Sequence, residues 1–460
     1  MTLLVQLLPL LALVLLLAFG RAGPILSCAV AIVLSLPAAL QVLPASALGG
    51  FVASSVLQGL WLAIVPVGIV TGGLAFHEAV GDRAGAAGAT DIADALFTGA
   101  FLLGPFTETV TGFGVGCIFA LASFRSIGVR GAPAAAIALL SQVLIPWGGL
   151  GPGTAIGAAL AGVDPQAMAA RAAVQVAGEW LLLLPLFWHW AARAGHAVPG
   201  AQRLSQLGWV AAAGALLVGL HHLVPWEVCG LLATGPVLAA KLLLRHRPRG
   251  VGEWRAAIGA AAPYLLLALV LLGSRLWTDA PAWAPLAGQP ALPANQAMVA
   301  LWLVAFLLLL RRGQARARIV AALRRARRPA AALLMFVLLA RFLTNGGVPQ
   351  ALAGALAHGL GRAAPFAAPM LAGVAGFFAG TNVGSNSAMM PLQAALGQVA
   401  GLGRLVLPSV QNGTLFLILS PQLTAIAGGL AGTTPARIWR LGWPVFLISL
   451  GAGLAAIAIG

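Results

Sequence analysis

Long apolar stretches, separated by short polar or basic segments, make up most of this chain. A run of about 18 or more apolar residues is typical of a helix that crosses a membrane. Because the runs show no alternation of inward and outward positions, they predict an all-α integral membrane protein rather than a barrel. We expect about 12 transmembrane helices, at residues 3–20, 24–43, 51–76, 132–162, 172–192, 205–221, 227–244, 256–275, 297–310, 330–345, 403–432 and 438–459.

Two further stretches, residues 92–124 and 365–400, are apolar at both ends and polar in the middle. The polar centre of the first runs from Thr107 to Gly114, and that of the second runs from Gly380 to Ser387. Glycines and small polar residues at membrane depth predict a break in the helix. We interpret both stretches as re-entrant hairpins, each of which returns to the membrane face from which it came.

The distribution of basic residues predicts the orientation, because they collect in cytoplasmic loops. The segment Arg311–Arg328 holds eight arginines between two apolar runs, and we expect it to be a cytoplasmic loop. With both hairpins re-entrant, the termini lie outside and most other basic residues lie inside. All but five of the 26 basic residues then lie inside, the exceptions being Arg171, Arg275, Arg341, Arg362 and Arg404.

The same count predicts an internal repeat. Residues 1–192 contain three spans, a hairpin and two spans, and residues 256–460 contain the same series in the opposite orientation, with residues 205–244 connecting them. The span after each hairpin is interrupted too, at Pro146-Trp147-Gly148-Gly149 and near Ser420-Pro421. Inverted repeats with broken helices are typical of secondary transporters, which bind substrate and coupling ion near the midplane.

Composition removes several other classes of protein. With 60% hydrophobic and 8% charged residues, the chain has too little charge for a soluble surface. Topology explains the net charge of +16, so we expect membrane lipid and no nucleic acid as a partner. Neither the three cysteines nor the acids near Asp91 and Asp94 have the spacing of a metal site, and we expect no metal and no cofactor.

Hydroxyl and amide groups at the two hairpin tips suit a small organic anion, because the helix N-termini at a break favour negative charge. The alternative is that small residues only allow the helices to pack closely. The two interrupted spans each add a side-chain amide to this set. We therefore expect the substrate-binding residues to be Thr107, Thr109, Thr111, Gly112, Gly114, Gln142, Thr381, Asn382, Ser385, Asn386, Ser387 and Gln411.

Two carboxyl groups within apolar runs are candidates for proton coupling. An ionisable side chain near mid-membrane is costly and usually has a partner or serves a transport pathway. Glu108 lies in the first polar centre, and Glu179 lies within a later span. The alternative for each is a structural hydrogen bond. Arg341 is a candidate partner for a substrate carboxylate, with snorkelling to the interface as the alternative.

The same residues resemble the lactate permease family of bacterial carboxylate transporters. LFTGAFLLGPFTETVTGFGVGCIFA at residues 96–120 is similar to the family segment GAFLEGAAGFGAP, and GVAGFFAGTNVGSNSAMMPL at residues 373–392 is similar to its second polar motif. The resemblance implies proton-coupled uptake of L-lactate or glycolate across the bacterial inner membrane. Glu108, Gly112, Gly114, Asn382, Ser385 and Asn386 match the motifs, whereas Thr109, Val110, Thr111 and Gly384 depart from them.

The leading hypothesis is therefore a proton-coupled monocarboxylate symporter, with homo-oligomerisation left open. A sodium-coupled carrier of another small anion is the alternative, because carbonyl groups at broken helices also bind Na⁺. An intramembrane enzyme is disfavoured, since such chemistry needs clustered acids, His or Lys. A passive channel is disfavoured by two broken segments in an inverted repeat.

Overall fold

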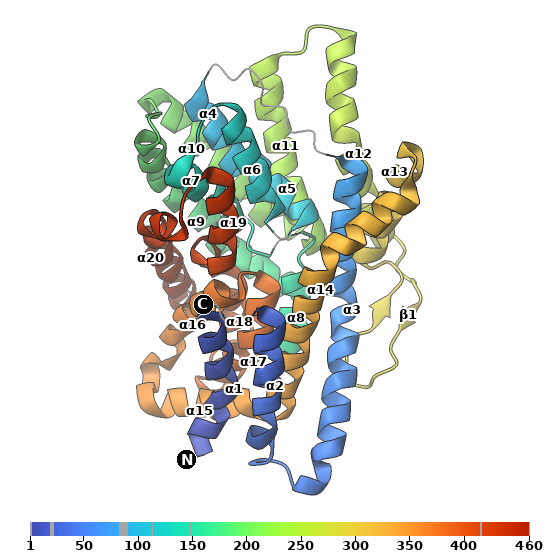
Figure 1. The fold of residues 1–460 in the computed structure, drawn as a ribbon, viewed down its shortest axis with the longest axis vertical. Helices are drawn as coiled ribbons and strands as arrows, with labels where there is room; N and C mark the ends of the chain where they lie inside the picture. Colours follow the sequence, from blue (N-terminus) through green and yellow to red (C-terminus); the bar gives the residue numbers. More distant parts are fainter. Residues whose placement is uncertain are drawn as a thin grey trace.

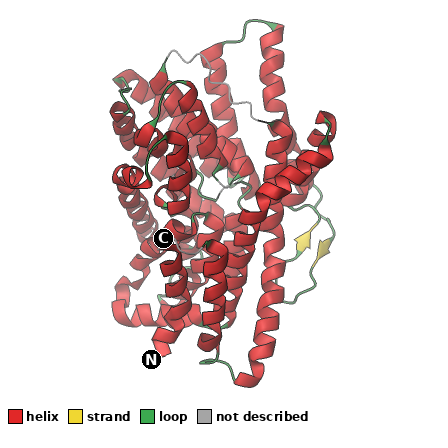
Figure 2. Cartoon of the chain, viewed as in Figure 1, coloured by secondary structure: helices red, strands yellow, loops and turns green. Residues whose placement is uncertain are grey.

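The computed structural model describes residues 2–18, 23–81, 91–112, 114–147, 149–414 and 416–459. Within them the structure is almost entirely helical, as the hydrophobic pattern predicts (Figure 2). The one sheet in the described residues pairs β1 (Ala282–Trp283) with β2 (Leu292–Pro293) in antiparallel register. The predicted loops at Arg21 and Arg83, together with Phe113 and Gly148, lie outside the described residues.

Helical segments long and apolar enough to cross a membrane number seven in the described part of the chain. They are Ala45–Val80, Pro165–Arg193, Gly200–Leu220, Trp226–Arg245, Val251–Arg275, Val348–Ala379 and Pro435–Ile459. Several predicted spans are instead shorter apolar helices, such as Leu3–Ala18 and Pro24–Ala39. The total of about 12 spans and the re-entrant course of the hairpins stay predictions.

The first part of the chain contains a hairpin followed by an interrupted helix. Its elements are α1 (Thr2–Ala18), α2 (Pro24–Ala39), η1 (Ala45–Ala47), α3 (Leu48–Val80), α4 (Ile92–Phe97), the π-helix η2 (Thr98–Leu103), α5 (Gly104–Thr111), α6 (Val115–Ser126), α7 (Gly131–Leu144), α8 (Pro152–Ala161) and α9 (Pro165–Arg193). The α4–η2–α5 arm and α6 form the predicted first hairpin, and α7 and α8 are the predicted interrupted span.

The second part also contains a hairpin followed by an interrupted helix, and it comes after α10 (Gly200–Leu220) and α11 (Trp226–His246). Its elements are α12 (Val251–Arg275), α13 (Ala297–Arg312), α14 (Ala315–Asn345), α15 (Val348–Leu360), η3 (Gly361–Ala367), α16 (Ala368–Ala379), α17 (Asn382–Val399), α18 (Val406–Gly413), η4 (Leu417–Leu419), α19 (Pro421–Ala431) and α20 (Pro435–Ile459). Here α16 and α17 form the hairpin, while α18 and α19 form the interrupted helix. That the two parts are inverted copies stays a prediction.

The arginine-rich segment is not the loop that we expected. Only Gly313 and Gln314 separate α13 from α14, and α14 begins at Ala315. Most of the arginines therefore lie on the first turns of a long helix. Arg325 forms an ion pair with Glu78 near the end of α3, so part of this charge binds another helix. Alternation with small apolar residues lets the helix continue through a segment that looks like a loop in hydropathy alone.

The two parts of the chain interleave. Helix α8, from the first part, packs on α17 of the second, and α19 packs on α6 and α7 of the first. Figure 1 shows α4–α7 in the upper half and α15–α18 in the lower half, with α3 running along the side and α14 crossing it. The interrupted helices consequently meet the hairpin of the opposite part near the middle of the molecule.

Candidate functional site

The first hairpin breaks at a pair of glycines. Helix α5 ends at Thr111 and α6 begins at Val115. Gly112 and Gly114 have φ values of +68° and +82°, a region that L side chains rarely adopt. The glycines of the sequence motif thus allow the chain to reverse direction within a few residues.

Glu108 is the centre of the contacts at this tip. Its Oε1 accepts a hydrogen bond from Gly114 N at 3.2 Å, and its Oε2 accepts from Gly116 N at 3.0 Å. The Gln142 amide of α7 donates to the same Oε2 at 3.0 Å. Two of the donors belong to the N-terminal turn of α6, where backbone N–H groups lack partners within the helix. One buried carboxylate therefore joins both arms of the hairpin to the interrupted helix.

The two arms pack too closely for a side chain to lie between them. A Cβ built on Gly116 would lie 2.3 Å from the Gly104 carbonyl oxygen and 3.0 Å from Glu108 Cβ. Glycine is therefore required at position 116 for the backbone amide to reach the carboxylate. The π-helix η2, just before Gly104, is an irregularity of a kind that often occurs at functional sites.

The second hairpin also turns at a glycine. Gly380, with a φ of +66°, ends α16, and Thr381 is the N-cap of α17. The Thr381 hydroxyl accepts a hydrogen bond from Gly384 N at 3.0 Å, which satisfies one free donor of the first turn. The next residue, Asn382, thus begins a helix that is buried among the other elements.

The interruption between α7 and α8 runs alongside both tips. Leu150 N donates to Thr109 O at 3.0 Å, which ties the interruption to the first hairpin. On the other side, a Cβ built on Gly153 would lie 1.7 Å from Asn382 Oδ1, so the start of α8 lies directly against the second hairpin. A Cβ built on Gly157, one turn later, would lie 2.6 Å from Met390 Cε and 3.0 Å from Asn386 Nδ2.

These three breaks enclose a cavity of about 40 Å³. Glu108, Gly112 and Gly114 line it from the first tip, and residues 380–383 line it from the second. Its remaining described wall comes from Gln142 and from the interruption between α7 and α8. A water molecule occupies about 30 Å³ of liquid, so the cavity holds about one water and is closed to a three-carbon carboxylate.

Beside the cavity lies a buried network of side-chain amides. Asn386 Nδ2 is 2.9 Å from Gly153 O, 3.0 Å from Asn412 Oδ1 and 3.2 Å from Asn382 Oδ1. Thr154 of α8 donates to the same Asn412 oxygen at 3.1 Å, and Asn382 donates to Asn412 O at 3.2 Å. The network joins α8, α17 and α18, and Asn412 Nδ2 is a buried donor with no partner.

Gln411 extends this network along α17. Its Nε2 donates to Ser385 Oγ at 2.9 Å, and its Oε1 accepts from Gln393 Nε2 at 3.0 Å. Ser387 is fully buried and its hydroxyl has no partner. Ser385, Asn386, Ser387 and Gln411 thus form the layer behind the cavity and do not line it.

The threonines of the first tip do not point into the cavity. Thr107, Thr109 and Thr111 donate to carbonyl groups three or four residues earlier on their own helix, at 2.7–2.9 Å. The Thr109 methyl group also packs against Gly230 of α11. Six of the sequence candidates therefore share the cavity wall: Glu108, Gly112, Gly114, Gln142, Thr381 and Asn382.

Two ionisable candidates lie away from this wall. Arg341 donates to Gln58 and to Asn345, and it does not line the cavity. Glu179 is fully buried on α9, where its two oxygens accept from Gln175 at 3.1 Å and Ser449 at 3.1 Å. Gln175 also donates to Thr414 at 2.7 Å, just after α18, so Glu179 is linked through Gln175 to the interruption between α18 and α19.

The part played by α8 was not expected from the sequence. Gly153 and Gly157 bring this helix against α17, and Thr154 joins the amide network. The Gly-x-x-x-Gly spacing, which is common where membrane helices pack closely, is the signal that could have identified this contact. Asn412, which connects α8, α17 and α18, was not among the expected substrate-binding residues.

Comparison with known proteins supports the resemblance. The model of the L-lactate permease family matches residues 291–435, which include the second hairpin and exclude Glu108. The resemblance to this family is thus confirmed for that segment. Together with the seven long apolar helices, it supports a multi-pass membrane transporter. No curated protein matches the sequence.

Two solved structures are similar to the chain. The Alcanivorax borkumensis YdaH transporter shares 18% identity, with 91% of this chain and 88% of that chain covered and a TM-score of 0.45. Neisseria gonorrhoeae MtrF, described as an example of a class of antimetabolite efflux pumps, shares 14% identity, with 95% of each chain covered and a TM-score of 0.49.

Proposed function

We propose that this protein is a secondary active transporter that carries a small monocarboxylate, such as L-lactate or glycolate, together with a proton. The observation that carries this proposal is the position of Glu108 on the wall of a buried cavity between two hairpin tips and an interrupted helix. The family match over residues 291–435 supports a carboxylate as the substrate class. The proposed location is the bacterial inner membrane, with both termini outside.

The cavity suits an anion without a basic side chain. Helices α6, α8 and α17 all begin at its wall, where Gly114 is the N-cap of α6 and where Pro152 and Asn382 are the first residues of α8 and α17. Helix N-termini carry partial positive charge and present backbone N–H groups. Neither lysine nor arginine is among the described lining residues, so these N-termini and the Asn382 amide are the groups proposed to bind the carboxylate.

Glu108 provides the coupling in this proposal. An ionised Glu108 repels an anion in the same cavity, and a proton on Glu108 removes that repulsion. By linkage, the proton favours binding of the anion and the anion favours binding of the proton to the same extent. The substrate and the proton are therefore expected to bind together and to leave together.

Glu179 is proposed as a second proton-binding group. It has no basic partner among the hydrogen bonds and ion pairs of the described residues, and Gln175 links it to Thr414. A proton there would act on the interruption after α18 through Gln175 and Thr414. Residues 1–192 would then contribute both proposed proton-binding carboxyl groups, Glu108 at the first hairpin tip and Glu179 beside the interruption after α18.

Movement of the hairpins is required for transport, since the cavity is too small for the substrate. We propose that the tips separate alternately toward each face, while α8 and α19, which pack on elements of the opposite part, couple the two movements. Thr107, Thr109 and Thr111, which were expected from the sequence to bind substrate, then act by stabilising the first tip rather than by touching the substrate.

Uptake into liposomes tests this function. Purified protein is reconstituted, and accumulation of radiolabelled L-lactate and glycolate is measured with an imposed proton gradient, an imposed sodium gradient, or neither. We expect accumulation with the proton gradient alone. Accumulation driven only by sodium would contradict proton coupling and support the sodium-coupled carrier, and equilibration without accumulation would indicate a channel.

A further inference from the structure

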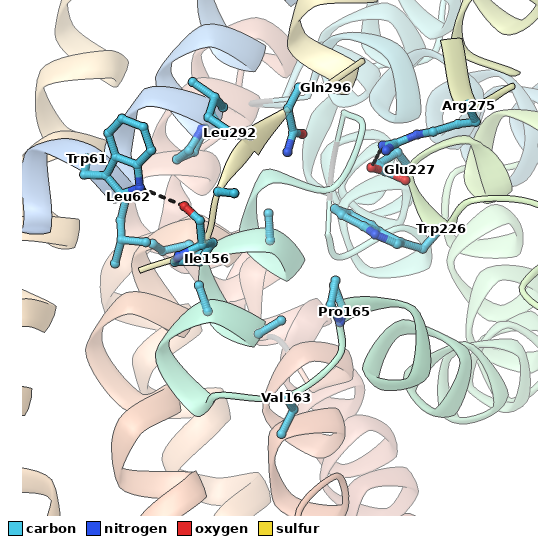
Figure 3. A pocket seen from close by; sticks show the side chains of 17 residues that line it. Trp61, Leu62, Ile156, Val163, Pro165, Trp226, Glu227, Arg275, Leu292 and Gln296 are labelled. Atoms are coloured by element: carbon cyan, nitrogen blue, oxygen red, sulfur yellow. Dashed lines mark hydrogen bonds and ion pairs between the residues drawn. The ribbon is translucent and has the colours of Figure 1, made fainter. Parts of the chain in front are cut away.

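A second and larger cavity lies on the other side of α8. It has a volume of about 380 Å³ and is walled by α3, α8, the start of α11, the end of α12 and the loop before α13 (Figure 3). Ala155 and Ile156 of α8 face it, whereas Gly153 and Gly157 of the same helix face α17. Helix α8 is thus the wall between this cavity and the site at the hairpin tips.

The walls of the larger cavity are mostly apolar, with a few polar groups gathered on one side. Arg275, in the last turn of α12, forms an ion pair with Glu227, in the first turn of α11. These two are the only charged side chains among the described lining residues. Figure 3 shows Gln296 approaching the cavity near them. An apolar cavity with one cation and one amide is the arrangement expected for a small carboxylate.

The ion pair is incomplete. Glu227 Oε2 is buried and has no partner, while the Arg275 side chain is 28% exposed. A buried carboxylate oxygen without a donor is costly, so the free energy of this pair is less favourable than in a bidentate pair. Glu227 therefore binds the Arg275 guanidinium group at the position where the carboxylate of a ligand would bind.

Trp226 connects this cavity to the hairpin-tip site. Its backbone N–H donates to Gln166 Oε1 at 2.8 Å, which fixes the start of α11. A Cβ built on Gly151 would lie 2.2 Å from the Trp226 ring, so the ring rests on the interruption between α7 and α8. The next residue, Pro152, lines the hairpin-tip cavity. The indole ring and the start of α8 thus lie between the two cavities.

We propose that the larger cavity is a vestibule in which Arg275 binds the carboxylate of the substrate, in exchange for Glu227, before the substrate passes Trp226 to the hairpin tips. This inference rests on the proposed function, because the ligand is the transported monocarboxylate. It adds a recruiting cation, Arg275, and a competing internal carboxylate, Glu227, neither of which lines the hairpin-tip cavity.

Opposite effects of the two ion-pair partners test the proposal. In liposomes, Arg275→Gln is expected to raise the half-saturating L-lactate concentration about tenfold with little change in maximal rate. Glu227→Gln removes the competitor and is expected to lower that concentration about threefold. Arg404→Gln is the matched control, since Arg404 is an exposed arginine that donates to Gly162 O and does not line the cavity.

If the Arg275–Glu227 ion pair only holds α11 against α12, we expect a different result. Both substitutions would then impair folding or transport in the same direction, and this outcome, or no change in either variant, would overturn the vestibule. Wild-type liposomes that take up no monocarboxylate would instead contradict the proposed function.

A binding measurement in detergent separates the two failures, because it does not require transport. Ala291→Cys places a thiol on the cavity wall, and Ala287→Cys places one on an exposed part of the same loop. Cys28, Cys117 and Cys229 are buried and should not react. We expect L-lactate to slow maleimide labelling of Ala291→Cys and not of Ala287→Cys. Equal labelling with and without L-lactate at position 291 would overturn the vestibule.

Discussion

Gln142 and Gln411 occupy equivalent places in the two interrupted helices. Each lies two residues before the end of its helix, α7 or α18, and each donates its amide to the hairpin that precedes it in the sequence. Gln142 Nε2 lies 3.0 Å from Glu108 Oε2, and Gln411 Nε2 lies 2.9 Å from Ser385 Oγ. The geometry is shared, but one amide meets a carboxylate and the other a hydroxyl.

Gln142→Leu is expected to change the pH dependence of transport. Loss of the donor destabilises the ionised form of Glu108, so the proton stays bound to higher pH and the falling limb of the rate profile moves to higher pH. The expected shift is about one pH unit or more, because a hydrogen bond to a charged group contributes about 1.5–3 kcal/mol. Initial rates of L-lactate uptake over a series of pH values measure it.

Gln411→Leu is the matched control for this measurement. It removes the equivalent amide from a neutral partner, so the pH profile should keep its midpoint while the protein becomes less stable. A shift of equal size in both variants would contradict a specific role for the contact between Gln142 and Glu108.

Glu108→Gln is expected to abolish proton-driven accumulation and to retain exchange of labelled for unlabelled substrate. The amide cannot carry a proton, and it has one acceptor oxygen where the carboxylate serves three donors. The melting temperature should therefore also fall. Glu253→Gln, at an exposed glutamate near the start of α12, should leave accumulation unchanged. Accumulation at the wild-type level by Glu108→Gln would remove Glu108 from the coupling mechanism.

Glu179→Gln tests the second proposed proton site. The substitution keeps an acceptor for Gln175 or Ser449 and removes the group that can bind a proton. We expect the accumulation ratio of L-lactate to fall severalfold while exchange continues. Ser449→Ala, which removes one donor and no titratable group, should behave as wild type. Equal effects of the two substitutions would assign Glu179 a structural role only.

Gly153→Ala is expected to block transport by separating α8 from the second hairpin. The added Cβ would lie 1.7 Å from Asn382 Oδ1, so either the helix or the asparagine must move. Gly178→Ala is the control, because it lies within α9 with no atom within 4 Å of the added carbon. The melting temperature of Gly178→Ala should be equal to that of the wild type or slightly higher, since alanine favours a helix over glycine by about 1 kcal/mol. Uptake rates and melting temperatures compare the two variants.

Asn386→Leu should be among the most destabilising changes at the site. Three oxygens, from Gly153, Asn382 and Asn412, lie within 3.2 Å of the Asn386 amide nitrogen. Each buried acceptor left without a donor costs about 1–3 kcal/mol. We expect a fall of several degrees or more in the melting temperature of the detergent-solubilised protein. The partly exposed Asn295, replaced by leucine, should give a much smaller change.

The breaks in the helices could be predicted from the sequence because they have local causes. Gly112, Gly114 and Gly380 adopt positive φ values, and they stand next to polar residues within apolar runs. The glycines and their polar neighbours can both be read directly from the sequence. The hydropathy pattern also gave the interruptions near Trp147 and Ser420 to within a few residues.

Other features could not be predicted because they depend on partners far away in the sequence or on local competition. The contact between Gly153 and Asn382 joins residues more than 200 positions apart. The Gly-x-x-x-Gly spacing indicates that α8 packs closely on another helix, but nothing near Gly153 indicates which helix. Thr107 and Thr111 were expected to face the substrate, but carbonyl groups of their own helix accept their hydroxyl hydrogens. Such back-bonding is available to any threonine in a helix, so residue type alone does not give the direction of its side chain.

The bridge that Glu108 makes across the first hairpin has a consequence for the empty carrier. While ionised, this carboxylate accepts from the backbone of both Gly114 and Gly116 and holds the start of α6 against α5. A proton would convert one acceptor into a hydroxyl donor facing N–H groups, and this would weaken the bridge. Opening of the tip is then most costly when neither proton nor substrate is bound, so the bridge would slow the return of the empty carrier.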